Sequence, residues 1–269
     1  MIYEKILLSV PGGDAELTVY APDNFPEIAP DRTRRAVVMC PGGGYRINSQ
    51  REAEPVALQL LAKDICVFLL RYAVEPVRYP VALTQIAAAV KYVRDHAAQY
   101  MVQPDKVAVM GYSAGGHLAA ELGVRWNEPW LAELLNAKPE KIRPDGMVLC
   151  YPVISGGEFR HQGSFEKLTG SDDPAEWEKH SLENLVHAGT PKAFLWHTFT
   201  DASVPVENSV MFFSALRRFG IPTELHIYPG GPHGLSLATE LTIAPDRPDL
   251  LQPDVANWLD MAVRWLKTM

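Results

Sequence analysis

A serine between glycines, in the stretch Gly111-Tyr112-Ser113-Ala114-Gly115, is the first candidate for a reactive group in this chain. The apolar run 105–112 before it has the character of a strand, and residues 115–125 after it have helical spacing. A serine on such a sharp strand-to-helix turn has a strained backbone that exposes its hydroxyl, and flanking glycines avoid the resulting clashes. Ser113 is therefore a candidate nucleophile. The alternative is an ordinary tight turn whose small residues serve packing.

A glycine run, Pro41-Gly42-Gly43-Gly44-Tyr45, directly follows the apolar stretch 34–40. It lacks the Lys-Ser/Thr end of a phosphate-binding loop and the third glycine of a dinucleotide-binding loop. Such a loop can instead turn backbone N–H groups toward a developing oxyanion. We expect the amides of Gly43 or Gly44, together with that of Ala114, to be the donors, unless the run is only a flexible surface loop.

Asp201 lies in the stretch HTFTDASVP, in the loop that follows the apolar run 192–199. A carboxylate at this position can accept a hydrogen bond from an imidazole and favour the imidazolium formed during catalysis. The alternative is that Asp201 only shapes the turn or caps the helix expected from about residue 206. Asp172 and Asp173 are rivals, but they lie in a polar segment and not at the end of a strand.

His233 lies in the Gly/Pro-rich stretch YPGGPHGLS, beyond the end of the apolar run 223–229. Six of the eight histidines precede Asp201, and His226 lies within the run itself. His233 is thus the candidate general base, although a loop histidine is often only a solvated side chain. The chain order Ser113, Asp201, His233 matches that of one known type of catalytic triad.

These residues must be positioned by a framework, and the sequence alternates strand-like and helical segments along its length. Short apolar runs bounded by Gly, Pro or Asp predict strands buried on both faces of a mostly parallel α/β sheet. The predicted strands cover 15–22, 34–40, 64–72, 105–112, 145–153, 192–199 and 223–229, and the predicted helices cover 51–62, 81–100, 115–125, 206–219 and 254–268. The carboxyl ends of such strands are where ligands bind. The polar segment 156–190 is expected to form a partial lid within a single domain, 1–269.

The composition of the chain limits the kinds of molecule that are expected to bind it. The chain has 25 basic and 32 acidic residues, a net charge of −7, and no basic stripe, so nucleic acid and anionic membranes are not expected to bind. The first ten residues leave no room for a signal peptide, and no apolar stretch approaches the length of a membrane span, so we expect a cytoplasmic protein. The three cysteines, Cys40, Cys66 and Cys150, have no metal-ligand spacing and are expected to be buried thiols.

The motifs together resemble those of α/β-hydrolases of the esterase/lipase superfamily, and within it the acetyl-xylan esterase and feruloyl-esterase-like group. The resemblance runs from about residue 35 to the C-terminus and rests on PGGGY, GYSAGGHLAA, YPV with SFEKLTG, the Asp201 loop and GPHGL. It implies a sheet of about eight strands with helices on both faces, and no metal or organic cofactor. Pro41 replaces the histidine of lipase-like members, which favours the sugar-ester group.

The resemblance implies roles for Ser113 as nucleophile, His233 as base and Asp201 as acid, with Gly43, Gly44 and Ala114 as oxyanion hole. We expect Tyr45 and Tyr112 to line the acyl pocket, the alternative being that they belong to the core. The expected partner is a small ester, with an acetylated oligosaccharide as first choice. A serine peptidase and a non-catalytic binding protein remain alternatives. The oligomeric state is left open, a homodimer being one alternative.

Overall fold

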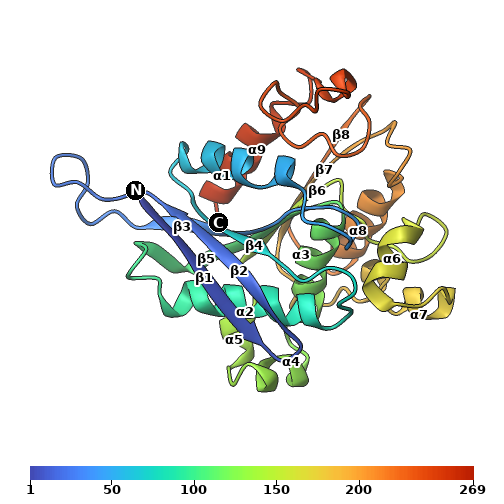
Figure 1. Ribbon diagram of the computed structural model, residues 1–269, viewed down its shortest axis with the longest axis horizontal. Coiled ribbons are helices and arrows are strands. Elements are labelled where there is room, and N and C mark those ends of the chain that lie inside the picture. The colour runs from blue at the N-terminus through green and yellow to red at the C-terminus, as the bar shows by residue number, and fades with distance from the viewer.

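Eight strands form one sheet in the computed structural model, which describes residues 1–269 (Figure 1). Their order across the sheet is β1-β2-β4-β3-β5-β6-β7-β8. The hairpin of β1 and β2 adds to β4 in the antiparallel direction, and all pairs from β4 to β8 are parallel. The strands are β1 Ile2–Val10, β2 Gly13–Ala21, β3 Arg34–Cys40, β4 Cys66–Arg71, β5 Val102–Tyr112, β6 Gly146–Cys150, β7 Ala193–Thr198 and β8 Thr223–Tyr228. The predicted α/β-hydrolase sheet is thus confirmed.

Helices cover both faces of this sheet (Figure 1). The α-helices are α1 Glu54–Leu61, α2 Val81–Asp95, α3 Ala114–Arg125, α4 Pro129–Leu134, α5 Pro139–Ile142, α6 Gln162–Thr169, α7 Pro174–Glu178, α8 Glu207–Arg218 and α9 Trp258–Lys267. Three short 3₁₀ helices are η1 Gln50–Glu52, η2 Leu182–Asn184 and η3 Pro248–Leu250. None of these helices combines the length and apolar character that crossing a bilayer requires.

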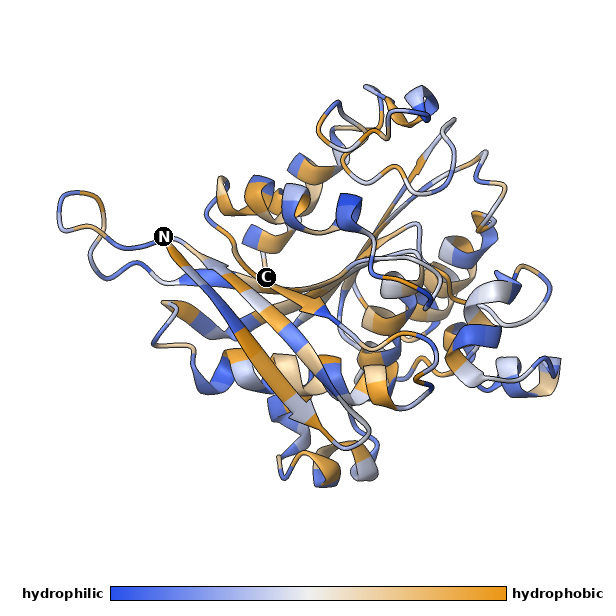
Figure 2. Ribbon diagram, in the orientation of Figure 1, coloured by the Kyte–Doolittle hydropathy of each residue, from blue (hydrophilic) through white to orange (hydrophobic).

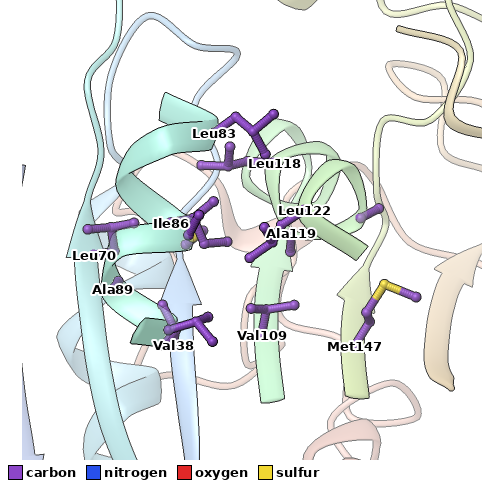
Figure 3. Packing of buried hydrophobic residues seen from close by; sticks show 14 of the residues in the cluster. Val38, Leu70, Leu83, Ile86, Ala89, Val109, Leu118, Ala119, Leu122 and Met147 are labelled. Atoms are coloured by element: carbon purple, nitrogen blue, oxygen red, sulfur yellow. The ribbon is translucent and has the colours of Figure 1, made fainter. Parts of the chain in front are cut away.

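The core consists of two apolar layers, one on each side of the sheet. Side chains of β3 alternate between them: Ala36 and Val38 belong to the layer under α2 and α3, whereas Val37 and Met39 belong to the layer under α1 and α9. This two-sided burial is why the inner strands are continuously apolar. Figure 2 shows the hydrophobic colour along these strands and the hydrophilic colour on outward helix faces. Figure 3 shows the first layer, with labelled side chains Val38, Leu70, Leu83, Ile86, Ala89, Val109, Leu118, Ala119, Leu122 and Met147.

The sequence analysis did not predict β1. In this edge strand, side chains that point away from the core, such as Tyr3 and Leu7, are exposed, so the segment lacks the continuous burial of the inner strands. The segment 156–190, expected to be a polar partial lid, contains α6, α7 and η2. Helix α6 ends at Gly170, whose φ of 76° provides the left-handed C-terminal residue. Cys40, Cys66 and Cys150 are buried and unpaired, as expected.

Candidate active site

Ser113 occupies a single-residue turn between β5 and α3. Its φ of 53° and ψ of −119° lie in a region that residues with a side chain rarely adopt. A Cβ atom on Gly111 would overlap the carbonyl oxygen of Gly115, and one on Gly115 would overlap the carbonyl oxygens of Cys40 and Pro41. The glycines therefore permit the close backbone approach that lets the serine stand at the end of β5.

The structure brings Ser113, His233 and Asp201 into one hydrogen-bonded chain. His233 Nε2 lies 2.8 Å from Ser113 Oγ, and His233 Nδ1 lies 2.6 Å from Asp201 Oδ2. The three residues follow the carboxyl ends of β5, β7 and β8, so a single edge of the sheet positions them. This arrangement can deprotonate a hydroxyl and hold the resulting imidazolium.

Asp201 is fixed as an ionised acceptor. Its Oδ1 accepts hydrogen bonds from the amides of Ser203 and Val204, both at 2.9 Å. Burial alone would raise the pKa of Asp201, but hydrogen bonds from His197 and His233 outweigh it, so the pKa lies well below its usual value. The carboxylate therefore remains charged at neutral pH, as an imidazolium partner requires.

His197 is a residue of this site that the sequence analysis did not assign. It is fully buried, and its Nε2 lies 2.9 Å from the Val204 carbonyl oxygen and 3.3 Å from Asp201 Oδ2. Because a carbonyl only accepts, the Nε2 must carry the proton, and Nδ1 accepts from the Ser209 hydroxyl at 2.8 Å. The only sequence signal was its position four residues before Asp201.

The glycine loop presents free backbone donors beside Ser113. The amides of Gly43 and Gly44 donate to no acceptor within the chain, and both glycines line the cavity that contains Ser113. Gly43 has a φ of 127°, and a Cβ atom there would overlap the Ile47 carbonyl oxygen. Ala114 is buried, and its amide is the first of α3, where no intrahelical acceptor exists. These amides can serve as an oxyanion hole.

A buried carboxylate, Glu52 in η1, connects the glycine loop to the histidine loop. Its Oε2 accepts from the Gly42 amide at 2.9 Å, and its Oε1 accepts from the Tyr151 hydroxyl at 2.7 Å. The same hydroxyl accepts from the Ser236 amide at 2.9 Å, and the Tyr151 ring packs edge-on against His233. This pair was not predicted from the sequence, since Glu52 and Tyr151 are far apart in the chain and the YPV motif that contains Tyr151 does not indicate its partner.

Tyr45 and Tyr112 do not line the cavity, which corrects the expectation that they form the acyl pocket. Tyr45 has a φ of 56°, is buried at 3% exposure, and its hydroxyl bonds to His117 Nδ1 at 2.9 Å. Tyr112 is fully buried and packs edge-on against Trp258 on the other side of the sheet. The turn at Tyr45 and the end of β5 at Tyr112 direct both rings into the core.

The rival candidates lie elsewhere. Asp173 caps α7 by accepting from the Ala175 amide, and Asp172 lies in a separate surface depression beside Arg78. His226 lies on β8 and faces Glu224 at 3.1 Å. No cluster of three or more His, Cys, Asp or Glu side chains that could hold a metal ion is present.

The cavity above Ser113 has a volume of about 520 Å³ and is lined mainly by charged, polar and glycine residues. Ile47 is its single apolar lining residue. The segment predicted as a partial lid contributes His161, Gly163 and Lys167 to the wall. Burial, and then the neighbouring His233, lower the pKa of His161. The lining thus offers charged and hydrogen-bonding groups to a ligand.

Comparison with known proteins gives concordant matches. The sequence model of the BD-FAE family matches residues 19–216. The structure of an acetyl ester-xyloside bifunctional hydrolase from Caldicellulosiruptor lactoaceticus has a TM-score of 0.79 and 36% identity, over 94% of this chain and 88% of that chain. The carboxylesterase Cest-2923 from Lactobacillus plantarum WCFS1 has a TM-score of 0.87 and 28% identity, over 100% and 98%.

A curated relative, an acetylxylan esterase from Xylanibacter ruminicola, is 30% identical over 254 residues, which cover 92% of this chain and 48% of the relative. The chain spans about half, or less, of the length of this and other curated relatives that it matches.

Proposed function

The chain belongs to the BD-FAE family, and from this membership we propose that it is a serine carboxylic-ester hydrolase that removes short acyl groups, acetyl above all, from carbohydrate. The membership confirms the resemblance to acetyl-xylan and feruloyl-esterase-like α/β-hydrolases. The observation that carries the proposal is the pair of short contacts from His233, at 2.8 Å to Ser113 Oγ and 2.6 Å to Asp201 Oδ2.

In the proposed reaction His233 Nε2 takes the hydroxyl proton as Ser113 Oγ attacks the ester carbonyl carbon. The negative charge on the carbonyl oxygen is held by the amides of Gly43, Gly44 and Ala114, each donor being worth about 3 kcal/mol in the transition state. The imidazolium gives its proton to the departing alcohol oxygen as the C–O bond breaks. Water then attacks the acyl-serine in a second cycle that releases the acid and restores Ser113.

The polar cavity supports a carbohydrate ester as the substrate. Its charged side chains and its free backbone amides at Gly43 and Gly44 offer hydrogen-bond partners to sugar hydroxyls. Two relatives point the same way, the acetylxylan esterase and the acetyl ester-xyloside bifunctional hydrolase.

The test is acetate release from acetylated xylo-oligosaccharides by the wild type and by Ser113→Ala, with 4-nitrophenyl acetate as a second substrate. We expect release by the wild type and its loss in Ser113→Ala, whereas Ser214→Ala, which changes an exposed serine on α8, should match the wild type. Equal release by wild type and Ser113→Ala would refute the serine mechanism. Serine-dependent cleavage of 4-nitrophenyl acetate alone would keep the esterase and refute the carbohydrate substrate.

A further inference from the structure

The cavity above Ser113 is lined by an excess of positive charge. Arg46, Arg51 and Lys167 lie on its wall, and Glu52 is the only carboxylate there. The chain as a whole has a net charge of −7, so this local excess is opposite to the overall composition. A positive cavity on a negative protein favours negatively charged ligands.

Two of these cations have no carboxylate partner. Lys167 pairs with Glu75 at 2.8 Å, but the Arg51 guanidinium donates only to backbone carbonyls, among them that of Gly234 at 2.9 Å. The side chain of Arg46 is exposed and makes no hydrogen bond or ion pair. Glu52, whose two oxygens accept from the Gly42 amide and the Tyr151 hydroxyl, offsets only one of the three positive charges.

Arg46 is held at a defined place beside the candidate catalytic residues. Its backbone amide donates to the Gly43 carbonyl oxygen at 3.0 Å, within the turn that carries the candidate oxyanion donors. An anion bound by its guanidinium would therefore lie within one arginine side-chain length of the ester carbonyl. On the wall formed by 161–167, His161 is oriented by a contact of 2.8 Å between its Nδ1 and Ser164 Oγ, and its Nε2 is left for a sugar hydroxyl.

We propose that the cavity selects carbohydrate esters that bear a carboxylate close to the acyl group, that is, acylated sugars linked to uronic acid units. Arg46 is the specificity-determining residue, because its planar guanidinium matches a carboxylate with two parallel hydrogen bonds. This inference rests on the proposed esterase function and narrows its substrate. The contact does not involve the reacting atoms themselves, so it acts equally in ground state and transition state and changes KM more than kcat.

The experiment compares two acetylated xylo-oligosaccharides of equal length, one with and one without a glucuronic acid substituent. For the wild type we expect kcat/KM to be about fivefold higher with the acidic substrate, mainly through a lower KM. In Arg46→Gln the ratio of the two values should fall to about one, and Arg46→Lys should restore part of it. Raising NaCl from about 0.05 M to about 0.5 M should reduce the wild-type ratio.

Arg218→Gln is the matched control, because it removes the same charge from the exposed C-terminal end of α8 and should leave the ratio as in the wild type. A wild-type ratio of one, or a ratio that Arg46→Gln leaves unchanged, would overturn the selectivity. Loss of the selectivity leaves the proposed function intact, provided that both sugars are still deacetylated in a Ser113-dependent way. If the protein cleaves neither sugar, both proposals are refuted.

Discussion

Replacing Asp201 by asparagine tests the proposed triad most directly, since the substitution keeps the shape of the side chain. In the native arrangement Oδ1 accepts from the amides of Ser203 and Val204, while Oδ2 accepts from His233 Nδ1 and lies 3.3 Å from His197 Nε2. An asparagine has one oxygen to divide between these two sides. Keeping it on the two backbone amides retains more hydrogen bonds, so its NH₂ group faces the two histidines.

That orientation places the new NH₂ group, a donor, opposite the two histidine nitrogens that donate in the native arrangement. His197 Nε2 is committed as a donor to the Val204 carbonyl, so it cannot accept from the new NH₂ group. His233 Nδ1 can accept, but its proton must then reside on Nε2, which points at Ser113 Oγ. A protonated Nε2 cannot take the serine proton. The amide replacement in a catalytic triad of this kind reduces kcat by about 10⁴-fold, which corresponds to about 5 kcal/mol in the activation free energy.

The assay is kcat for 4-nitrophenyl acetate, together with urea unfolding to verify that Asp201→Asn is folded. Asp173→Asn makes the same chemical change at the cap of α7, where asparagine also caps well, and should retain wild-type kcat. A rate for Asp201→Asn within tenfold of the wild type would refute the tautomer argument and the assignment of Asp201 as the acid.

Three further predictions concern the surroundings of the site. Glu52→Gln places an NH₂ donor against either the Gly42 amide or the Tyr151 hydroxyl, so kcat for 4-nitrophenyl acetate should fall about 10-fold to 100-fold; an unchanged kcat would contradict the positioning role. Gly43→Ala should lower kcat about 10²-fold to 10³-fold, because a methyl group would displace the loop from its φ of 127°, and a smaller loss would argue against its amide as a donor. Burial lowers the pKa of His117 to about 4, so the unfolded chain binds the extra proton between pH 6.5 and pH 4 and stability falls by roughly 3 kcal/mol on acidification through that range. Urea unfolding at several pH values should show this fall in the free energy of unfolding for the wild type and a smaller fall for His117→Gln. Equal falls would assign the titration to another residue.

The three triad candidates were predictable from the sequence because each follows a strand, and parallel strands deliver their carboxyl ends to one edge. Residues that act through a distant partner were not predictable in this way. Glu52 and Tyr151 meet across 99 positions in the chain, and only the assembled sheet places them together. The direction of a side chain at an irregular turn or at the end of a strand was equally inaccessible, as the inward-facing rings of Tyr45 and Tyr112 demonstrate.

The inner strands of the framework were predicted well, whereas the N-terminal edge strand was not. Strands β3, β4, β6 and β7 are buried almost throughout, whereas β1 lies at an edge and exposes every second side chain. The segment 156–190 forms short helices such as α6 and α7, which are stabilised by packing and caps more than by a long periodic pattern.

Three residues that line the cavity above Ser113 are separable from those that hold the sheet together. Arg46, His161 and Lys167 lie outside both apolar layers, and the loop and helix that carry them are joined to the sheet by other residues, such as Phe165 and Leu168. Exchanges at these three positions therefore cost little folding free energy. An engineer could randomise them as a small library, screening for new ester preferences while the reaction chemistry and the thermal tolerance of the scaffold stay constant.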